Sequence, residues 1–280
     1  MRPGERLGPL RRDAGGRDGA GHLLLGRPDR PARNPALTTP TSPVPAPAAP
    51  APVWEDFLEI FYSPSAVFER RKASGFGIPL LVFVVGLTAA FYAGRNAMEP
   101  IFDAEFARGM VTAAKANPNI TPEQMEQGRA FARGITPVFL TGYALFGPML
   151  IGLLLWLAGK IVEARQELGA ACMVATYALY PRLLEALLNI LQALLLPSDR
   201  LTSHFALQLG PARFLDYNSS SLLLLTILGR LDLITLWCTA LLAIGLSVTG
   251  RIPLARAGIA AIAVWLVGYI VPLWGALRAS

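Results

Sequence analysis

The sequence has 280 residues, 53% hydrophobic and 16% charged, and this charged fraction is below the roughly 25% of soluble domains, which indicates an integral membrane protein. The formal net charge is +6, and the first 50 residues supply +4 of it through eight arginines against four acidic residues. Because the rest of the chain has no basic stripe interleaved with aromatic residues, a nucleic-acid-binding surface is excluded.

Residues 1–53 form a Pro-, Ala- and Arg-rich tail that contains eleven of the 23 prolines. Too few large apolar residues occur there to build a core, so we predict that the tail is disordered. Its only apolar run, at residues 22–26, is too short for a secretory signal, which needs about 7–15 apolar residues. We interpret the tail as a dispensable arm; the alternative is a cytosolic recruiting segment with a Pro-rich stretch at residues 43–52.

Residues 54–75 are predicted to form an amphipathic segment at the membrane–water interface. Trp54, Phe57 and Phe61 lie at helical spacing, and Ser63-Pro64 is typical of an N-cap followed by the first residue of a second short helix. That helix should end in the basic cluster Arg70-Arg71-Lys72. Aromatic residues beside a basic cluster are typical of the cytoplasmic membrane boundary, where the segment would contact the lipid bilayer.

Five apolar runs of 16 to 29 residues follow, and a bilayer crossing needs about 20 residues. They predict an all-α, polytopic membrane helix bundle (residues 76–280) with spans at 76–94, 137–158, 168–196, 233–248 and 257–276. The mixed-charge segment 96–135 predicts a solvated helical hairpin, whose second helix begins with a capping box at Thr121–Gln124. Thr136-Pro137 then marks the start of the second span. The run 222–228 is too short to cross.

The third span, residues 168–196, carries unusual polar residues. As one helix it would measure about 43 Å, and a charge at its centre costs about 2.5–3.5 kcal/mol on insertion scales. Tyr177 and Pro181 precede Arg182, and Glu185 follows three positions later on the same face as Arg182. Asn189 and then Gln192 continue this polar stripe. We interpret the stripe as polar packing between helices; the alternative is a path for a substrate or ion.

Asp232 is placed to cap the fourth span, because its carboxylate can accept from the free amides of the first turn. The sequence otherwise offers little catalytic chemistry. His22 and His204 lack Cys or carboxylate neighbours at ligand spacing, Cys172 and Cys238 lie in apolar runs, and no phosphate-binding loop occurs. We therefore predict no catalytic, cofactor or metal site. An intramembrane catalytic site on Arg182, Glu185 and Asp232 remains the minor alternative.

Five crossings place the two termini on opposite sides of the membrane. Short basic connections identify one side as cytoplasmic by the positive-inside rule, which predicts a cytoplasmic N-terminus, an external C-terminus and a location in the cytoplasmic membrane. The basic residues that carry this argument are Arg70, Arg71, Lys72, Lys160, Arg165, Arg251 and Arg256.

Three short motifs in chain order resemble the Yip family of five-span membrane proteins, in its prokaryotic branch. They are the amphipathic Phe57-x-x-Ile60-Phe61-x-Ser63-Pro64, the motif Thr176-Tyr177-Ala178-Leu179-Tyr180-Pro181, and Leu231-Asp232-Leu233 followed by Trp237 and Ile244-Gly245-Leu246. The similarity covers about Trp54 to Ala276. In the family's Gly-Tyr-x-x-x-Pro element this chain has Thr176 in place of Gly, while Tyr177 and Pro181 match.

The resemblance implies a helical membrane protein with a cytosolic N-terminus and no known catalytic residues. Eukaryotic relatives associate with Rab-type GTPases and organise trafficking membranes, but the tail shows no eukaryotic sorting signature, so this role is not carried over. We expect a non-enzymatic scaffold or adaptor that contacts other membrane proteins or a second copy of itself. A small permease or channel component that uses the polar stripe of the third span, with an unknown small-molecule substrate, is the alternative.

Overall fold

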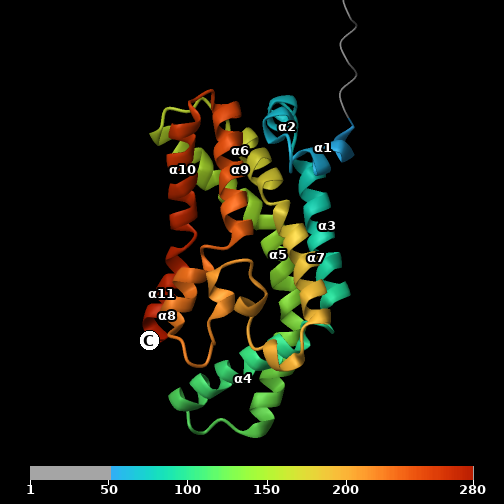
Figure 1. Ribbon diagram of the computed structural model, residues 1–280, viewed down its shortest axis with the longest axis vertical. Helices are drawn as coiled ribbons and strands as arrows, with labels where there is room; N and C mark the ends of the chain where they lie inside the picture. The colour runs from blue at the N-terminus through green and yellow to red at the C-terminus, as the bar shows by residue number, and fades with distance from the viewer. Residues whose placement is uncertain (1–51, 280) are drawn as a thin grey trace, which may run out of the picture. The chain divides into compact units, whose positions relative to one another are not determined.

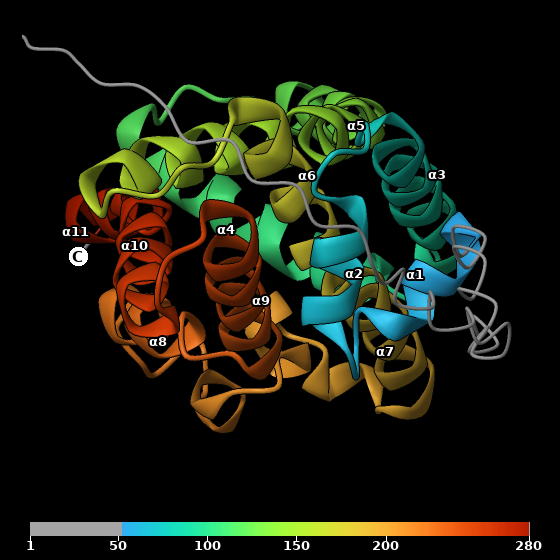
Figure 2. The same cartoon turned by 90° about the horizontal axis from the view of Figure 1, so that it is seen from above.

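A computed structural model describes residues 52–279, so the tail predicted for residues 1–53 lies outside the described residues apart from its last two positions. The described part of the chain consists of α-helices and short 3₁₀ turns without β-strands. Figures 1 and 2 show these helices packed side by side. We name the two ends of the bundle after helices found there: the α2 end carries α1 (Val53–Glu59) and α2 (Pro64–Arg71), and the α4 end carries α4 (Glu99–Ala116).

Five helical segments are long and apolar enough to cross a membrane, as the sequence predicts. They are Gly77–Gly94 (α3), Pro122–Ile161 (α5), Leu168–Leu195 (α6 and α7), Leu233–Gly250 (α9) and Leu254–Arg278 (α10 and most of α11). Their outer faces expose large apolar side chains: Leu81 is 63% exposed, Phe139 72% and Phe146 65%. Such exposure is costly in water and favourable in lipid, so it fits helices whose outer faces contact the bilayer.

The helix that contains the predicted second span is continuous with the helix that precedes it. Thr121 and Gln124 form the expected capping box, but α5 then continues for 40 residues through Pro137 and Pro148 instead of starting at Thr136-Pro137. Ion pairs from α5 to Asp103 of α4, at 2.5 Å from Arg129 and 3.1 Å from Arg133, hold the turns before Pro137 in place. A proline inside a helix removes one hydrogen bond, and neighbouring turns supported in this way can continue past it.

The third crossing, predicted as one helix over 168–196, is divided into α6 (Leu168–Ala178) and α7 (Pro181–Leu195). Pro181 has no N–H to donate to the carbonyl of Tyr177, so the α-helical pattern stops there. That carbonyl accepts instead from the backbone N–H of Tyr180 at 3.1 Å, which makes the break a tight turn. Every residue from 171 to 178 is buried, so α6 is enclosed by its neighbours.

Close helix packing around α6 depends on small residues. A Cβ atom added to Gly152 of α5 would lie 2.7 Å from the Cα and 2.9 Å from the backbone N of Cys172 in α6. Only glycine allows the two backbones to approach this closely. On its other side α6 packs against α9 (Leu233–Gly250), which in turn packs against α10 (Leu254–Val267).

The long connection from α7 to α9 folds into three 3₁₀ turns and the short helix α8. Their bounds are Ser198–Arg200 (η1), His204–Leu207 (η2), Pro211–Phe214 (η3) and Leu222–Gly229 (α8). With eight residues, α8 is too short to cross a bilayer, as predicted. It packs instead against α11 (Ile270–Ala279), the last helix of the fifth crossing.

Candidate functional site: a buried carboxylate at the α2 end

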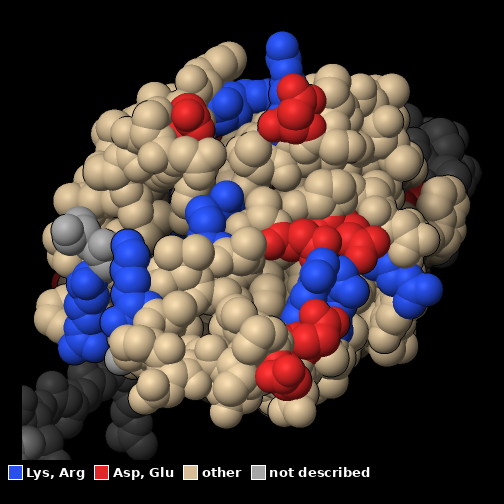
Figure 3. All heavy atoms as spheres, turned by 90° about the horizontal axis from the view of Figure 1, so that it is seen from below, with Lys and Arg blue, Asp and Glu red and all other residues tan. Residues whose placement is uncertain are grey.

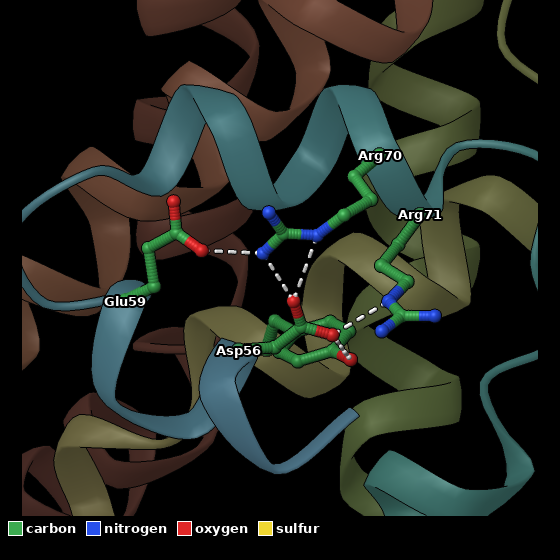
Figure 4. Close-up of polar contacts among 5 residues, drawn as sticks. Asp56, Glu59, Arg70 and Arg71 are labelled. Carbon is green, nitrogen blue, oxygen red and sulfur yellow. Dashed lines mark hydrogen bonds and ion pairs between the residues drawn. The ribbon is translucent and has the colours of Figure 1, made fainter. Parts of the chain in front are cut away.

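The Asp56 carboxylate is the most densely bonded polar group at the α2 end, although it is fully buried. Its Oδ1 accepts from Nε of Arg70 at 3.1 Å and from Nη2 of the same side chain at 2.5 Å. Its Oδ2 accepts from Nε of Arg71 at 2.6 Å and from the hydroxyl of Tyr177 at 3.0 Å. Figure 4 shows these contacts, which join α1, α2 and α6 at one point. We call Asp56, Glu59, Arg70, Arg71 and Tyr177 the Asp56 cluster.

The Asp56 cluster balances its charges. Glu59 accepts from Nη2 of Arg70 at 2.5 Å, so two carboxylates face two guanidinium groups. The hydrogen bond to Glu59, together with the bond to Asp56 and its charge, raises the pKa of Arg70 above its ordinary value. An isolated buried carboxylate would be strongly unfavourable, and it is tolerated only when it is paired and hydrogen-bonded in this way. With four donors already bound to Asp56, the cluster is suited to holding helices together rather than to transferring protons.

Aromatic contacts reinforce the junction. The Phe57 ring packs edge-to-face on Tyr180 with centroids 5.3 Å apart, and Phe61 packs in the same manner on Trp237 of α9 at 5.3 Å. Tyr180 itself donates from its hydroxyl to the carbonyl of Pro79 at 2.8 Å, which links the break in the third crossing to α3. The inner face of α1 therefore packs on the bundle.

The residues that the sequence placed at the membrane interface fall into two groups in the structure, those that are exposed and those that face the bundle. Trp54 is 61% exposed on the outer face of α1, whereas Phe57 and Phe61 face the bundle. In the basic cluster that we predicted at the interface, Arg70 and Arg71 turn toward Asp56, and Lys72 pairs with Glu69. The sequence could not show this, because Asp56 belongs to a different helix, 14 and 15 residues before the arginines. Ser63 precedes α2 as predicted, but its side chain makes no capping bond.

The polar stripe of the third crossing lies on α7. Arg182 and Glu185 form the ion pair expected from their spacing, at 2.6 Å, and Arg182 also donates from Nη2 to Thr235 of α9 at 2.8 Å. Gln192 donates to the carbonyl of Leu207 at 3.0 Å. Asn189 instead lines a cavity of about 470 Å³ among α3, α4, α5 and α7. The stripe is thus distributed over three different surroundings, and its contacts favour packing between elements over a continuous path.

Asp232 caps α9 as predicted, with its Oδ1 accepting from the backbone N–H groups of Ile234 at 3.0 Å and Thr235 at 3.1 Å. Its Oδ2 also accepts from the backbone N–H of Leu209 at 2.8 Å, a contact that the sequence did not predict. Asp232 therefore fixes the connection between η2 and η3 against the start of α9. Among the described residues, no hydrogen bond joins Asp56 or Asp232 directly to the Arg182–Glu185 pair.

Two further polar groups were missed by sequence reasoning. His204, which has no carboxylate neighbour in sequence, lies 2.6 Å through Nδ1 from Glu105 of α4. Gln166, in the connection between α5 and α6, is buried, and neither of its amide atoms has a hydrogen-bond partner among the described residues. Within residues 52–279, no three His, Cys, Asp or Glu side chains gather as they would around a metal ion. Cys172 and Cys238 are buried free thiols.

Comparison with known proteins identifies one family. No curated protein and no solved structure matches the sequence. The model of the Yip1 domain, in contrast, matches residues 58–275, which include the first four membrane-crossing segments in full, most of the fifth, and most of the described chain. The matched region also contains the Tyr177 and Pro181 positions on which the Asp56 cluster and the break between α6 and α7 depend. The chain therefore belongs to the Yip family of multi-pass membrane proteins.

Proposed function

We propose that this protein is a non-enzymatic scaffold or adaptor of the prokaryotic cytoplasmic membrane, in which α1 and α2 form the surface that binds other membrane proteins or a second copy. We call residues 53–71 the α1–α2 unit. The proposal places the N-terminus in the cytoplasm and the C-terminus outside. Membership of a family of non-catalytic membrane proteins supports a role in binding rather than in catalysis.

One observation carries the proposal: the α1–α2 unit is fixed from inside, and the outer face of α1 and of the turn that follows it is apolar. The Asp56 cluster and the packed Phe57 and Phe61 rings hold its inner face. Its outer face exposes Trp54 at 61%, Leu58 at 63% and Tyr62 at 77%. A rigidly held surface of large apolar and aromatic side chains is typical of a protein interaction site, because little conformational entropy is lost on binding.

Photo-crosslinking in native membranes tests this role. A benzoylphenylalanine introduced at Trp54, Leu58 or Tyr62 should form adducts with the same protein partner, identified by mass spectrometry. The matched control is Ile60, which is on the same helical segment but fully buried, and its adducts should be intramolecular. Adducts with lipid alone at all three outer positions would contradict the adaptor role and indicate a membrane anchor.

The Asp56→Asn variant adds a second readout to the same experiment. It removes the negative charge that two arginines share and should release the α1–α2 unit while the five crossings stay inserted. We expect the partner adducts from Leu58 to fall several-fold at unchanged protein level in the membrane. Unchanged adducts would show that binding does not depend on the fixed position of the α1–α2 unit.

A further inference from the structure

A second cavity lies toward the α4 end, away from the Asp56 cluster. It is open on one side, has a volume of about 600 Å³ and is lined by residues of α4, η2, α8 and α11. The residues that line it come from four separate segments of the chain, which explains why no sequence motif indicated it. Its volume falls within the range of about 300–1,000 Å³ that is usual for small-molecule sites. Figure 3 shows this end of the molecule, where several basic side chains stand apart from any acidic one.

Two arginines line the cavity. Arg108 of α4 donates from Nη2 to the carbonyl of Thr202 at 2.6 Å, and its guanidinium group lies 3.9 Å from the centre of the Tyr217 ring. Arg230, at the end of α8, donates from Nη2 to the carbonyl of Trp265 at 2.7 Å. Neither arginine forms an ion pair within the part of the chain that the structure describes.

The carboxylate that lines the cavity does not neutralise both arginines. Glu105 accepts from the backbone N–H of His204 at 2.9 Å and lies 2.6 Å from the imidazole Nδ1 of the same residue. Burial and the nearby charge of Arg182 lower the pKa of Arg230 below its ordinary value. The cavity therefore has an excess of positive charge.

Unpaired polar atoms are concentrated around this cavity. Eight buried side-chain atoms in the described residues have no hydrogen-bond partner, and four of them belong to residues that line it: Nε of Arg108, Oε1 of Gln208, Nε of Arg230 and the hydroxyl of Tyr269. Folded proteins rarely retain buried polar atoms without partners, and where such atoms gather a water molecule or ligand usually completes the bonding.

We propose that this cavity binds an oxyanion, the phosphate or carboxylate group of an organic molecule, between Arg108 and Arg230. Guanidinium groups match such anions in charge and in the geometry of their paired donors. Phe205, Tyr217 and Leu222 provide the apolar wall against which the rest of the molecule packs. The oxyanion comes from a soluble metabolite or from a lipid headgroup. This site is independent of the proposed adaptor surface, which lies at the α2 end.

Thermal unfolding of the purified full chain tests the site. In neutral detergent at constant ionic strength, inorganic phosphate should raise the unfolding midpoint by about 3 °C once it is in tenfold excess over its Kd. In lipid nanodiscs, replacing part of the phosphatidylcholine with phosphatidylglycerol tests the headgroup. The variant Arg230→Gln should abolish the response, and Arg200→Gln, which removes an exposed arginine of η1 outside the cavity, should keep it.

A cavity-filling variant separates loss of binding from loss of folding. A Cβ added to Gly275, which lines the cavity, meets no atom within 4 Å, so Gly275→Leu should fold, retain both arginines and lose the response. A response to phosphate supports a soluble ligand, and a response to phosphatidylglycerol alone supports a lipid headgroup. The proposal is overturned if neither changes the midpoint of the unmodified chain, or if Arg230→Gln and Gly275→Leu respond as strongly as Arg200→Gln.

Discussion

Single residues at the α2 end show how buried charged side chains hold the helices of this membrane protein together. Asp56 is fully buried and accepts four hydrogen bonds, from two side chains of α2 and from Tyr177 of α6. The Arg182–Glu185 pair performs a similar task within the bundle, where Arg182 also binds Thr235 of α9. In both places the cost of removing charge from water is offset by several directed bonds, so the arrangement is specific to one packing of the helices.

The hydroxyl of Tyr177 permits a conservative test of the Asp56 cluster. Tyr177→Phe keeps the ring that packs on Tyr180 and removes one hydrogen bond to a buried carboxylate. A bond to a charged group contributes about 1.5–3 kcal/mol, which corresponds to a decrease of about 3–12 °C in the unfolding midpoint for a domain of this size. Differential scanning fluorimetry in detergent measures this decrease in the unfolding midpoint.

Tyr62→Phe is the matched control for that prediction. It removes a hydroxyl from a side chain that is 77% exposed, so the midpoint should stay unchanged. Equal decreases for the two variants would mean that the Tyr177–Asp56 bond does not stabilise the fold.

Proline occurs in two kinds of position in these helices, either inside a continuous helix or at the boundary between two helices. Pro137 lies inside α5, whereas Pro181 ends the preceding helix and begins α7. The difference lies in the surroundings: the turns before Pro137 are ion-paired to α4, and Tyr180, just before Pro181, is bound through its hydroxyl to α3. A proline therefore marks a helix boundary only where tertiary contacts favour the alternative path of the chain.

Contact between α5 and α6 gives a prediction at the scale of elements. Gly152→Ala places a Cβ within 2.9 Å of three Cys172 atoms, two of them in the backbone, so α5 and α6 must separate. Overpacking of this kind costs about 1–3 kcal/mol. Gly142→Ala, in the same helix, meets no atom within 4 Å and should stabilise the helix by about 0.5–1 kcal/mol. Unfolding midpoints that move in the same direction for both variants would contradict this account of the contact.

The two ends of the whole molecule are built differently. The α2 end is closed by the α1–α2 unit and by a bond from the backbone N–H of Arg165 to the carbonyl of Gly250, which joins two connections between crossings. The α4 end carries longer connections, including the η turns and α8, and the cavity lined by Arg108 and Arg230.

The orientation of the whole molecule in the membrane is predicted from the short basic connections of the α2 end, which should face the cytoplasm. In intact cells, a membrane-impermeant maleimide should label Asn119→Cys, in the turn between α4 and α5, and leave Ser74→Cys at the α2 end unlabelled. Both positions are exposed, and the native Cys172 and Cys238 are buried, so their reaction should remain weak. Both variants should be labelled after permeabilisation. Labelling of Ser74→Cys alone in intact cells would reverse the proposed orientation.

Local patterns in the sequence determined the all-helical class, the five crossings, the capping box at Thr121 and the cap at Asp232. Each cap depends on residues within about one helical turn, and each crossing depends on one continuous apolar run of about 20 residues. Only the tertiary structure decided that Arg70 and Arg71 bind Asp56, that Glu105 meets His204, and that Arg108 and Arg230 share a cavity. These residues lie on separate elements, and their encounter depends on how apolar helix faces pack. The apolar faces of different helices carry similar side chains, so a single sequence does not specify which faces meet.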